Sequence, residues 1–95
     1  MPSPQKSVEQ RLGAAIRTRR EELGLSQEQL AFECGLHRTY ISQLERGMKS
    51  PTVRVLFALA KALKTTPEKL VAQISTKALK TTPEKLVAQI SNSKN

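Results

Sequence analysis

Apolar residues recur every three or four positions along most of this 95-residue chain. That spacing places them on one face of an α-helix, whereas a half-buried strand would alternate at every second position. The pattern predicts five successive helices, over residues 8–23, 27–34, 37–46, 51–63 and 67–80. We therefore expect an all-α fold whose core is built from the inner faces of these helices.

Capping and turn residues bound the second and third of these helices. Ser26 and Gln29 have the spacing of a capping box, in which each side chain binds a free backbone N–H at the start of a helix. Gly35 can take the positive φ that a tight turn requires, and Gly47 is a suitable residue to end a helix. Residues 26–47 therefore read as two short helices joined by a sharp turn.

The two later helices carry a different start signal. Ser50 precedes Pro51, and Thr66 precedes Pro67. Serine and threonine cap a helix well, and proline suits the first helical position because it has no N–H to leave unpaired. The apolar stripes that we expect to face the core are Leu12, Ala15, Ile16, Leu23, Leu30, Ala31, Cys34, Ile41, Leu44, Val53, Leu56, Phe57, Ala60, Leu63, Leu70, Val71 and Ile74.

The outer face of the helix over residues 37–46 carries side chains that suit base edges: Arg38, Thr39, Tyr40 and Gln43. Arginine matches guanine, glutamine matches adenine, and a threonine methyl can meet the thymine methyl. Tyr40 would contact a base edge or stack along the sugar–phosphate backbone. The alternative is an ordinary pair of amphipathic helices with a polar outside. The small residue Ala31 and the turn residue Gly35 favour a recognition helix.

The charge balance fits a polyanionic partner. The chain has 16 Lys and Arg against 8 Asp and Glu, a formal net charge of +8 and a pI near 10.2. Charge alone does not choose among DNA, RNA and a membrane surface. Lys49 and Arg54 flank a helix start and could hold a phosphate together with its backbone N–H groups. His37 could cap the helix after it, touch a phosphate or remain an ordinary surface residue.

Several function classes lack residues to support them. Cys34 and His37 form no cluster with metal-ligand spacing, and no nucleophile–base pair is recognisable, so we expect no enzyme, metal or cofactor and see no small-molecule site. Only 3% of the residues are aromatic, so the aliphatic side chains must fill one modest core. No apolar run has membrane-spanning length, and the first ten residues lack the hydrophobic region of a secretion signal, so we expect a cytoplasmic protein.

The segment SQEQLAFECGLHRTYISQLERG, residues 26–47, resembles the helix-turn-helix of the Xre family of lambda-type repressors. Its LHRTYISQLERG part is most similar to controller proteins of restriction–modification systems. The resemblance covers Leu12 to Leu70 and implies a five-helix lambda-repressor-like DNA-binding domain. It also implies an ion pair between Arg20 and Glu45, a contact of Gln27 with the DNA backbone, and a last helix that joins a two-fold dimer.

An internal repeat follows this region, because KALKTTPEKLVAQIS at residues 61–75 recurs unchanged at 77–91. We expect a flexible arm over residues 1–7, the DNA-binding domain over 8–75, and a duplicated extension with an extra C-terminal helix over 76–95. The second copy would pack on a neighbouring subunit, take the place of the first copy, or be a neutral tail. The expected dimer contacts are Leu70, Val71, Ile74, Leu79, Leu86, Val87 and Ile90.

These features predict a sequence-specific transcriptional regulator that binds double-stranded DNA. A homodimer would place two recognition helices about 34–36 Å apart, one turn of the duplex, and would therefore bind a palindromic operator. The alternative function is an antitoxin-type protein-interaction module in which DNA binding is secondary.

Overall fold

The computed structural model describes residues 7–79, which form five helices and no strand. The helices are α1 (Val8–Glu22), α2 (Gln27–Cys34), α3 (Arg38–Glu45), α4 (Val53–Ala62) and α5 (Pro67–Leu79). The predicted all-α fold is confirmed. The expectations for the arm before Ser7 and for Leu86, Val87 and Ile90 concern positions outside the described residues.

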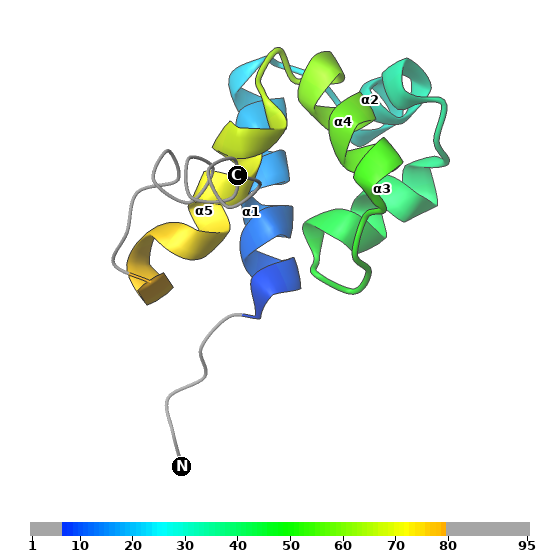
Figure 1. Cartoon of the computed structure of the whole chain (residues 1–95). Helices are drawn as coiled ribbons and strands as arrows, with labels where there is room; N and C mark the ends of the chain where they lie inside the picture. Colours follow the sequence, from blue (N-terminus) through cyan, green and yellow to red (C-terminus); the bar gives the residue numbers. More distant parts are fainter. Residues whose placement is uncertain (1–6, 80–95) are drawn as a thin grey trace.

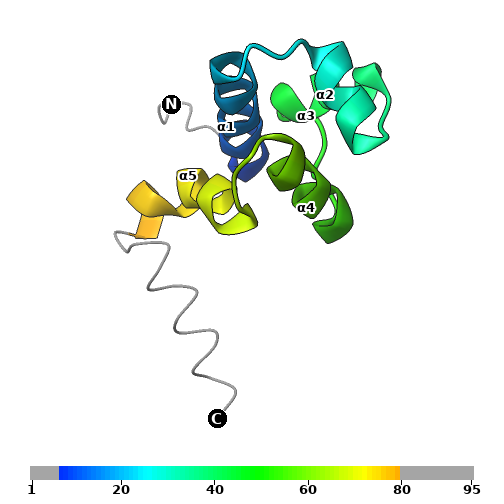
Figure 2. The ribbon, with the colours of Figure 1, turned by 90° about the horizontal axis from the view of Figure 1, so that it is seen from above.

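The helices surround a single aliphatic core. α1 contacts α3 and α5, and α2 contacts α3 and α4, so that α1 and α5 lie side by side on one side of the molecule (Figures 1 and 2). α4 closes the gap between α2 and α5. The buried apolar residues are Leu12, Ile16, Leu30, Ala31, Ile41, Leu44, Leu59, Ala60, Leu63 and Leu70.

The capping box predicted at Ser26 forms in the structure, and a second one that was not predicted forms at Ser7. The Ser26 hydroxyl accepts from the Gln29 backbone N–H, while the Gln29 amide oxygen accepts from the Ser26 N–H. Ser7 and Gln10 make the same reciprocal pair at the start of α1. Ser7 therefore belongs to the folded domain and not to the arm. Gly35 ends α2 at φ 67°, in the left-handed region that favours glycine.

The predicted start of α4 is wrong by two residues. Thr52 is the N-cap, because its hydroxyl accepts from the backbone N–H of Val55. The hydroxyl of Ser50, which we expected to cap this helix, instead donates to the carboxylate of Glu9 on α1. Pro51 lies before the cap and is therefore not the first residue of the helix.

Two residues expected on the inner stripe of α4 are exposed. Val53 is 72% exposed and Phe57 is 59% exposed, whereas Leu59, Ala60 and Leu63 are buried. The prediction failed because apolar residues occur on most sides of α4, so that spacing alone does not select the buried side. Contacts from α2 and α5 on one side make that selection.

α5 begins at the predicted signal, where the Thr66 hydroxyl accepts from the backbone N–H of Lys69. Leu70 is buried and Ile74 packs against the core, as expected. Val71 is 37% exposed, so its assignment to the core-facing side is wrong. The helix continues to Leu79, close to the predicted end.

Candidate nucleic-acid interface

The site is built on α3, which the α2–α3 turn holds against the core. Ile41 and Leu44 of α3 are 0% and 1% exposed, and both belong to the core cluster with Ala31 of α2. The small side chain of Ala31, only 3% exposed, allows the two helices to approach closely. The buried stripe fixes which side of α3 faces outward.

Helix geometry then orders the polar residues around α3. At about 100° per residue, Thr39 and Gln43 lie almost opposite Ile41, with Arg46 close to them. Arg38 lies nearer the buried stripe, but it is exposed because it stands at the first position of the helix. The guanidinium therefore leaves the helix at its N-terminal end, while Thr39 and Gln43 form the centre of the outer face.

The remaining predicted site residues surround this face with differing exposure. His37, Thr39, Lys49 and Arg54 are exposed, whereas Tyr40, Gln43 and Gln27 are half-buried. Tyr40 packs partly against the core, which restricts its ring to the side of the face. His37 is the N-cap residue of α3 but its side chain makes no capping hydrogen bond, so the capping alternative for His37 is not realised.

A buried polar network ties the two ends of the motif to α1. The Arg20 Nε donates to the Glu45 Oε2 at 2.6 Å and its Nη2 donates to the Glu45 Oε1 at 3.0 Å. The side chains of Arg20 and Glu45 are only 11% and 3% exposed. Because Arg20 donates these bonds to the Glu45 carboxylate, the pKa of Arg20 is raised above its ordinary value. Arg20 also donates to the carbonyl of Leu25, just before α2.

Gln27 is part of the same network. Its Nε2 donates to the Glu45 Oε1 at 3.0 Å, so that the first residue of α2 is bound to the last residue of α3. This bond fixes the direction of the Gln27 side chain and leaves its amide oxygen and its second N–H unassigned. Glu45 thus positions a residue that the sequence suggested as a DNA-backbone contact.

Gly13, which the sequence reading did not single out, brings α1 against the end of α3. A Cβ at Gly13 would collide with the carbonyl oxygen of Leu44 and lie 2.6 Å from that of Glu45. The absence of a side chain at this position allows α1 to lie close enough for Arg20 to reach Glu45. The signal in the sequence that could have indicated this close approach is a glycine inside an otherwise regular helical pattern.

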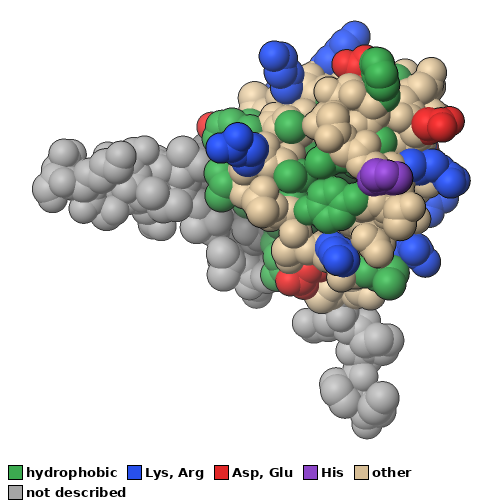
Figure 3. All heavy atoms as spheres, turned by 90° about the vertical axis from the view of Figure 1, so that its right-hand side faces the viewer, with side chains coloured by type: hydrophobic (Ala, Val, Ile, Leu, Met, Phe, Trp, Pro, Cys, Tyr) green, Lys and Arg blue, Asp and Glu red, His purple; other side chains and the backbone are tan. Residues whose placement is uncertain are grey.

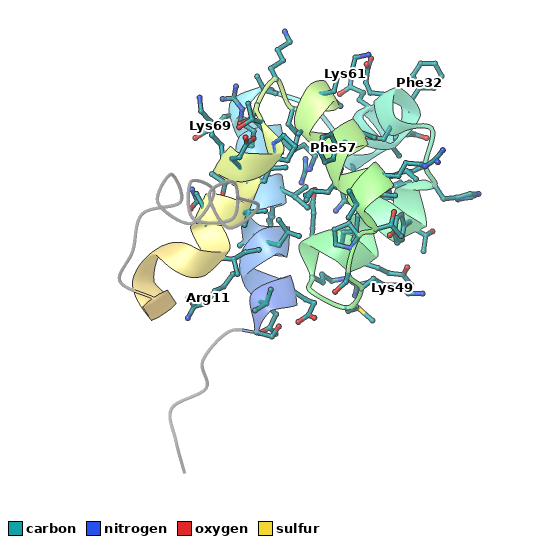
Figure 4. The ribbon with its side chains drawn as sticks, in the orientation of Figure 1. Arg11, Phe32, Lys49, Phe57, Lys61 and Lys69 are labelled. Carbon is teal, nitrogen blue, oxygen red and sulfur yellow. The ribbon has the colours of Figure 1, made fainter. Side chains whose placement is uncertain are left out.

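Positive charge on α3 and α4 is not paired with exposed carboxylates of the same segment. From His37 to Lys61 the only acidic residue is Glu45, which is buried and paired with Arg20. The same stretch contains five basic residues: Arg38, Arg46, Lys49, Arg54 and Lys61. Within residues 7–79 none of these five forms an ion pair. Basic side chains lie around the face that carries α2 and α3 (Figure 3), and Lys49 extends from the connection after α3 (Figure 4).

In the part of the chain that the structure describes, arginines of α1, unlike the basic residues of α3 and α4, pair with carboxylates of the domain. Arg17 pairs with Glu21, and Arg19 pairs with Glu22. Arg19 also donates to the carbonyls of Leu63 and Lys64, where it closes the C-terminal end of α4. Arg17 and Arg19 therefore make contacts within the domain.

Other chemistries find no support in the described part of the chain. Residues 7–79 contain no group of three His, Cys, Asp or Glu side chains that could hold a metal ion. Cys34 packs against the core and its thiol contacts the carbonyl of Ala58, and burial raises the pKa of this thiol. Among the same residues no helix has the length and apolar character to cross a membrane.

A short helix, a tight left-handed turn and a second helix with an exposed polar face define a helix-turn-helix protein. The helix-turn-helix family matches residues 16–70, which is more than half of the chain, and the chain belongs to this family. The resemblance noted for residues 26–47 is thereby confirmed.

Relatives and solved structures agree with this assignment. The control protein C.SmaI of Serratia marcescens is 44% identical over 66 residues, which are 70% of this chain and 79% of C.SmaI. The restriction-modification controller protein C.AhdI from Aeromonas hydrophila has a TM-score of 0.63 and 39% identity, over 64% of this chain and 92% of that one. The P22 c2 repressor, solved with a synthetic operator, has a TM-score of 0.60 and 39% identity, over 62% and 89% of the two chains. Together they support a DNA-binding transcriptional regulator.

Proposed function

We propose that this protein is a sequence-specific transcriptional regulator that binds a palindromic operator as a homodimer. The observation that carries the proposal is the surface of α3 and α4, which has unpaired arginine and lysine side chains and no exposed carboxylate between His37 and Lys61. A duplex would place its phosphates against these charges and release counterions.

The position of each side chain on α3 suggests its role. Arg38, Thr39 and Gln43 enter the major groove and contact base edges, with Arg38 at the N-terminal end, where recognition helices approach the bases most closely. Tyr40 lies at the side of this face and contacts a base edge or the adjoining sugar. These contacts would specify the sequence.

The surrounding residues would hold the duplex without reading it. Gln27, oriented by Glu45, and Arg46, at the C-terminal end of α3, contact phosphates on the two sides of the groove. Lys49, Arg54 and His37 extend this set along the backbone. The proposal adds Arg46 because it shares the outer face of α3 with Thr39 and Gln43.

We propose that α5 forms the contact between the two subunits of the homodimer. Val71 is exposed on α5, next to the buried Leu70, and would pack on the same residue of a second subunit. Because a two-fold contact uses the same patch on both subunits, it would duplicate the α3 face symmetrically. The operator would then consist of two half-sites about 10–10.5 base pairs apart, centre to centre.

Selection of bound oligonucleotides from a random duplex pool tests this proposal. The full chain at physiological salt is expected to enrich one motif with two-fold symmetry, and a single-stranded pool is the matched control. Enrichment of an asymmetric motif would contradict dimeric binding. The absence of any enriched duplex would overturn sequence-specific DNA binding, and recovery of a protein complex without DNA would favour the antitoxin-type alternative.

A further inference from the structure

The contacts described for the first part of α5 come from residues 66–74, which lie within the first repeat copy. Leu70 is 4% exposed, and Ile74 packs against the core cluster that includes Leu12 of α1. The Arg11 Nη1 lies 3.5 Å from the carbonyl oxygen of Ile74, and Arg11 extends from α1 beside α5 in Figure 4. We call the surface of α1 and α4 that α5 covers the α5 seat.

The start of α5 is also specified within the repeat. The Thr66 hydroxyl caps the helix by accepting from the Lys69 N–H at 3.2 Å, and Pro67 is the first helical residue. Residues 66–75, TPEKLVAQIS, therefore contain the cap, the first turn and the buried positions that the α5 seat requires. No residue after Ser75 is needed for these contacts.

The same ten residues occur a second time. Residues 82–91 are also TPEKLVAQIS, and they follow at an offset of sixteen positions. Thr82, Leu86 and Ile90 correspond to Thr66, Leu70 and Ile74. Each domain has one α5 seat, whereas each chain has two segments that fit it with identical side chains.

We propose that residues 82–91 occupy the α5 seat of their own chain in exchange with residues 66–75. In the exchanged form, residues 66–81 make a sixteen-residue excursion between the end of α4 and the helix in the seat. α4 stays in place, because Arg19 closes its end at the carbonyls of Leu63 and Lys64, which lie before the excursion.

The two forms differ in free energy mainly by the cost of closing a loop. In both forms one copy is buried and the other lacks the α5 seat, so the buried contacts are the same. The exchanged form must close a sixteen-residue loop, and the cost of loop closure grows only with the logarithm of length, so the first copy is favoured roughly 10- to 100-fold. Since the main contacts of α5 are with α1 and α4, the exchange leaves the nucleic-acid interface on α3 in place.

Paired substitutions at the two equivalent leucines test this proposal. Leu70→Asp, Leu86→Asp and the double variant are made in the full chain, and the folding equilibrium constant is measured by urea unfolding. A buried aspartate in the α5 seat would reduce this constant by more than roughly 1,000-fold. Exchange would limit the loss in Leu70→Asp to roughly 10- to 100-fold, because Leu86 replaces Leu70.

Leu86→Asp is the matched control, with an expected loss of less than about twofold, and the double variant should show the full loss. If Leu70→Asp is destabilised as much as the double variant, the second copy does not enter the α5 seat and the proposal is overturned. If the stability that Leu70→Asp retains falls when the protein is diluted, while that of the wild type does not, residues 82–91 of a second chain occupy the α5 seat. That result would also overturn the proposal.

Discussion

At the scale of single residues, Glu45 is central to the arrangement of the motif. Its carboxylate, 3% exposed, binds the guanidinium of Arg20 from α1 and the amide of Gln27 from α2. Burial of a charge is tolerated when a partner and hydrogen bonds compensate it. The network therefore joins three helices at one point and fixes the Gln27 amide beside Glu45.

Removal of this carboxylate should be far more costly than removal of an exposed one. Glu45→Ala leaves the buried guanidinium of Arg20 without its partner, and we expect a loss of roughly 3–5 kcal/mol in the free energy of unfolding. Glu28→Ala, at an exposed first-turn position of α2, is the control and should cost less than about 1 kcal/mol. Urea unfolding measures both. Equal losses would show that the ion pair does not hold the motif together.

At the scale of helices, the sequence predicted most of the elements but not how closely they pack. The capping pairs Ser26–Gln29 and Thr66–Lys69 depend on neighbouring residues, so local patterns reveal them. The buried side of α4 depends on where α2 and α5 lie, which explains why the exposure of Phe57 was not foreseen (Figure 4). The cap at Ser50 was predicted wrongly because the residue that Ser50 binds, Glu9, is distant in the sequence and no local pattern indicates it.

The packing of α1 on α3 gives a prediction at this scale. Gly13→Ala improves the helix propensity of α1 by up to about 1 kcal/mol. The added Cβ, however, would collide with the backbone at the end of α3, and backbone cannot move aside as a flexible side chain can. We expect a net loss of roughly 1–3 kcal/mol in the free energy of unfolding.

Thr18→Ala, at an exposed position of α1, is the control for this substitution. It has a smaller gain in helix propensity and no collision, so the free energy of unfolding should stay constant or rise by roughly a few tenths of a kcal/mol. Thermal unfolding of the two variants compares them. Stabilisation by Gly13→Ala would mean that α1 does not approach α3 as closely as described.

At the scale of the whole molecule, basic residues are divided between two tasks. The arginines of α1 bind carboxylates and helix-end carbonyls inside the domain, whereas those of α3 and α4 remain without ion pairs among the described residues. The net charge of +8 predicted a polyanionic partner but did not indicate which surface binds it. The ion pairs add to this, because within residues 7–79 they engage arginines of α1 and leave the arginines and lysines of residues 38–61 without a carboxylate partner.

We propose that α3 reads bases through Arg38 while other basic residues bind the DNA backbone. The most direct test measures the affinity of the wild type, Arg38→Ala and Arg46→Ala for every single-base-pair variant of one half-site at fixed salt. We predict that Arg38→Ala loses about 1–3 kcal/mol of discrimination at one position and keeps the other preferences, whereas Arg46→Ala weakens all duplexes equally. Uniform weakening by Arg38→Ala, with every base preference intact, would contradict the account.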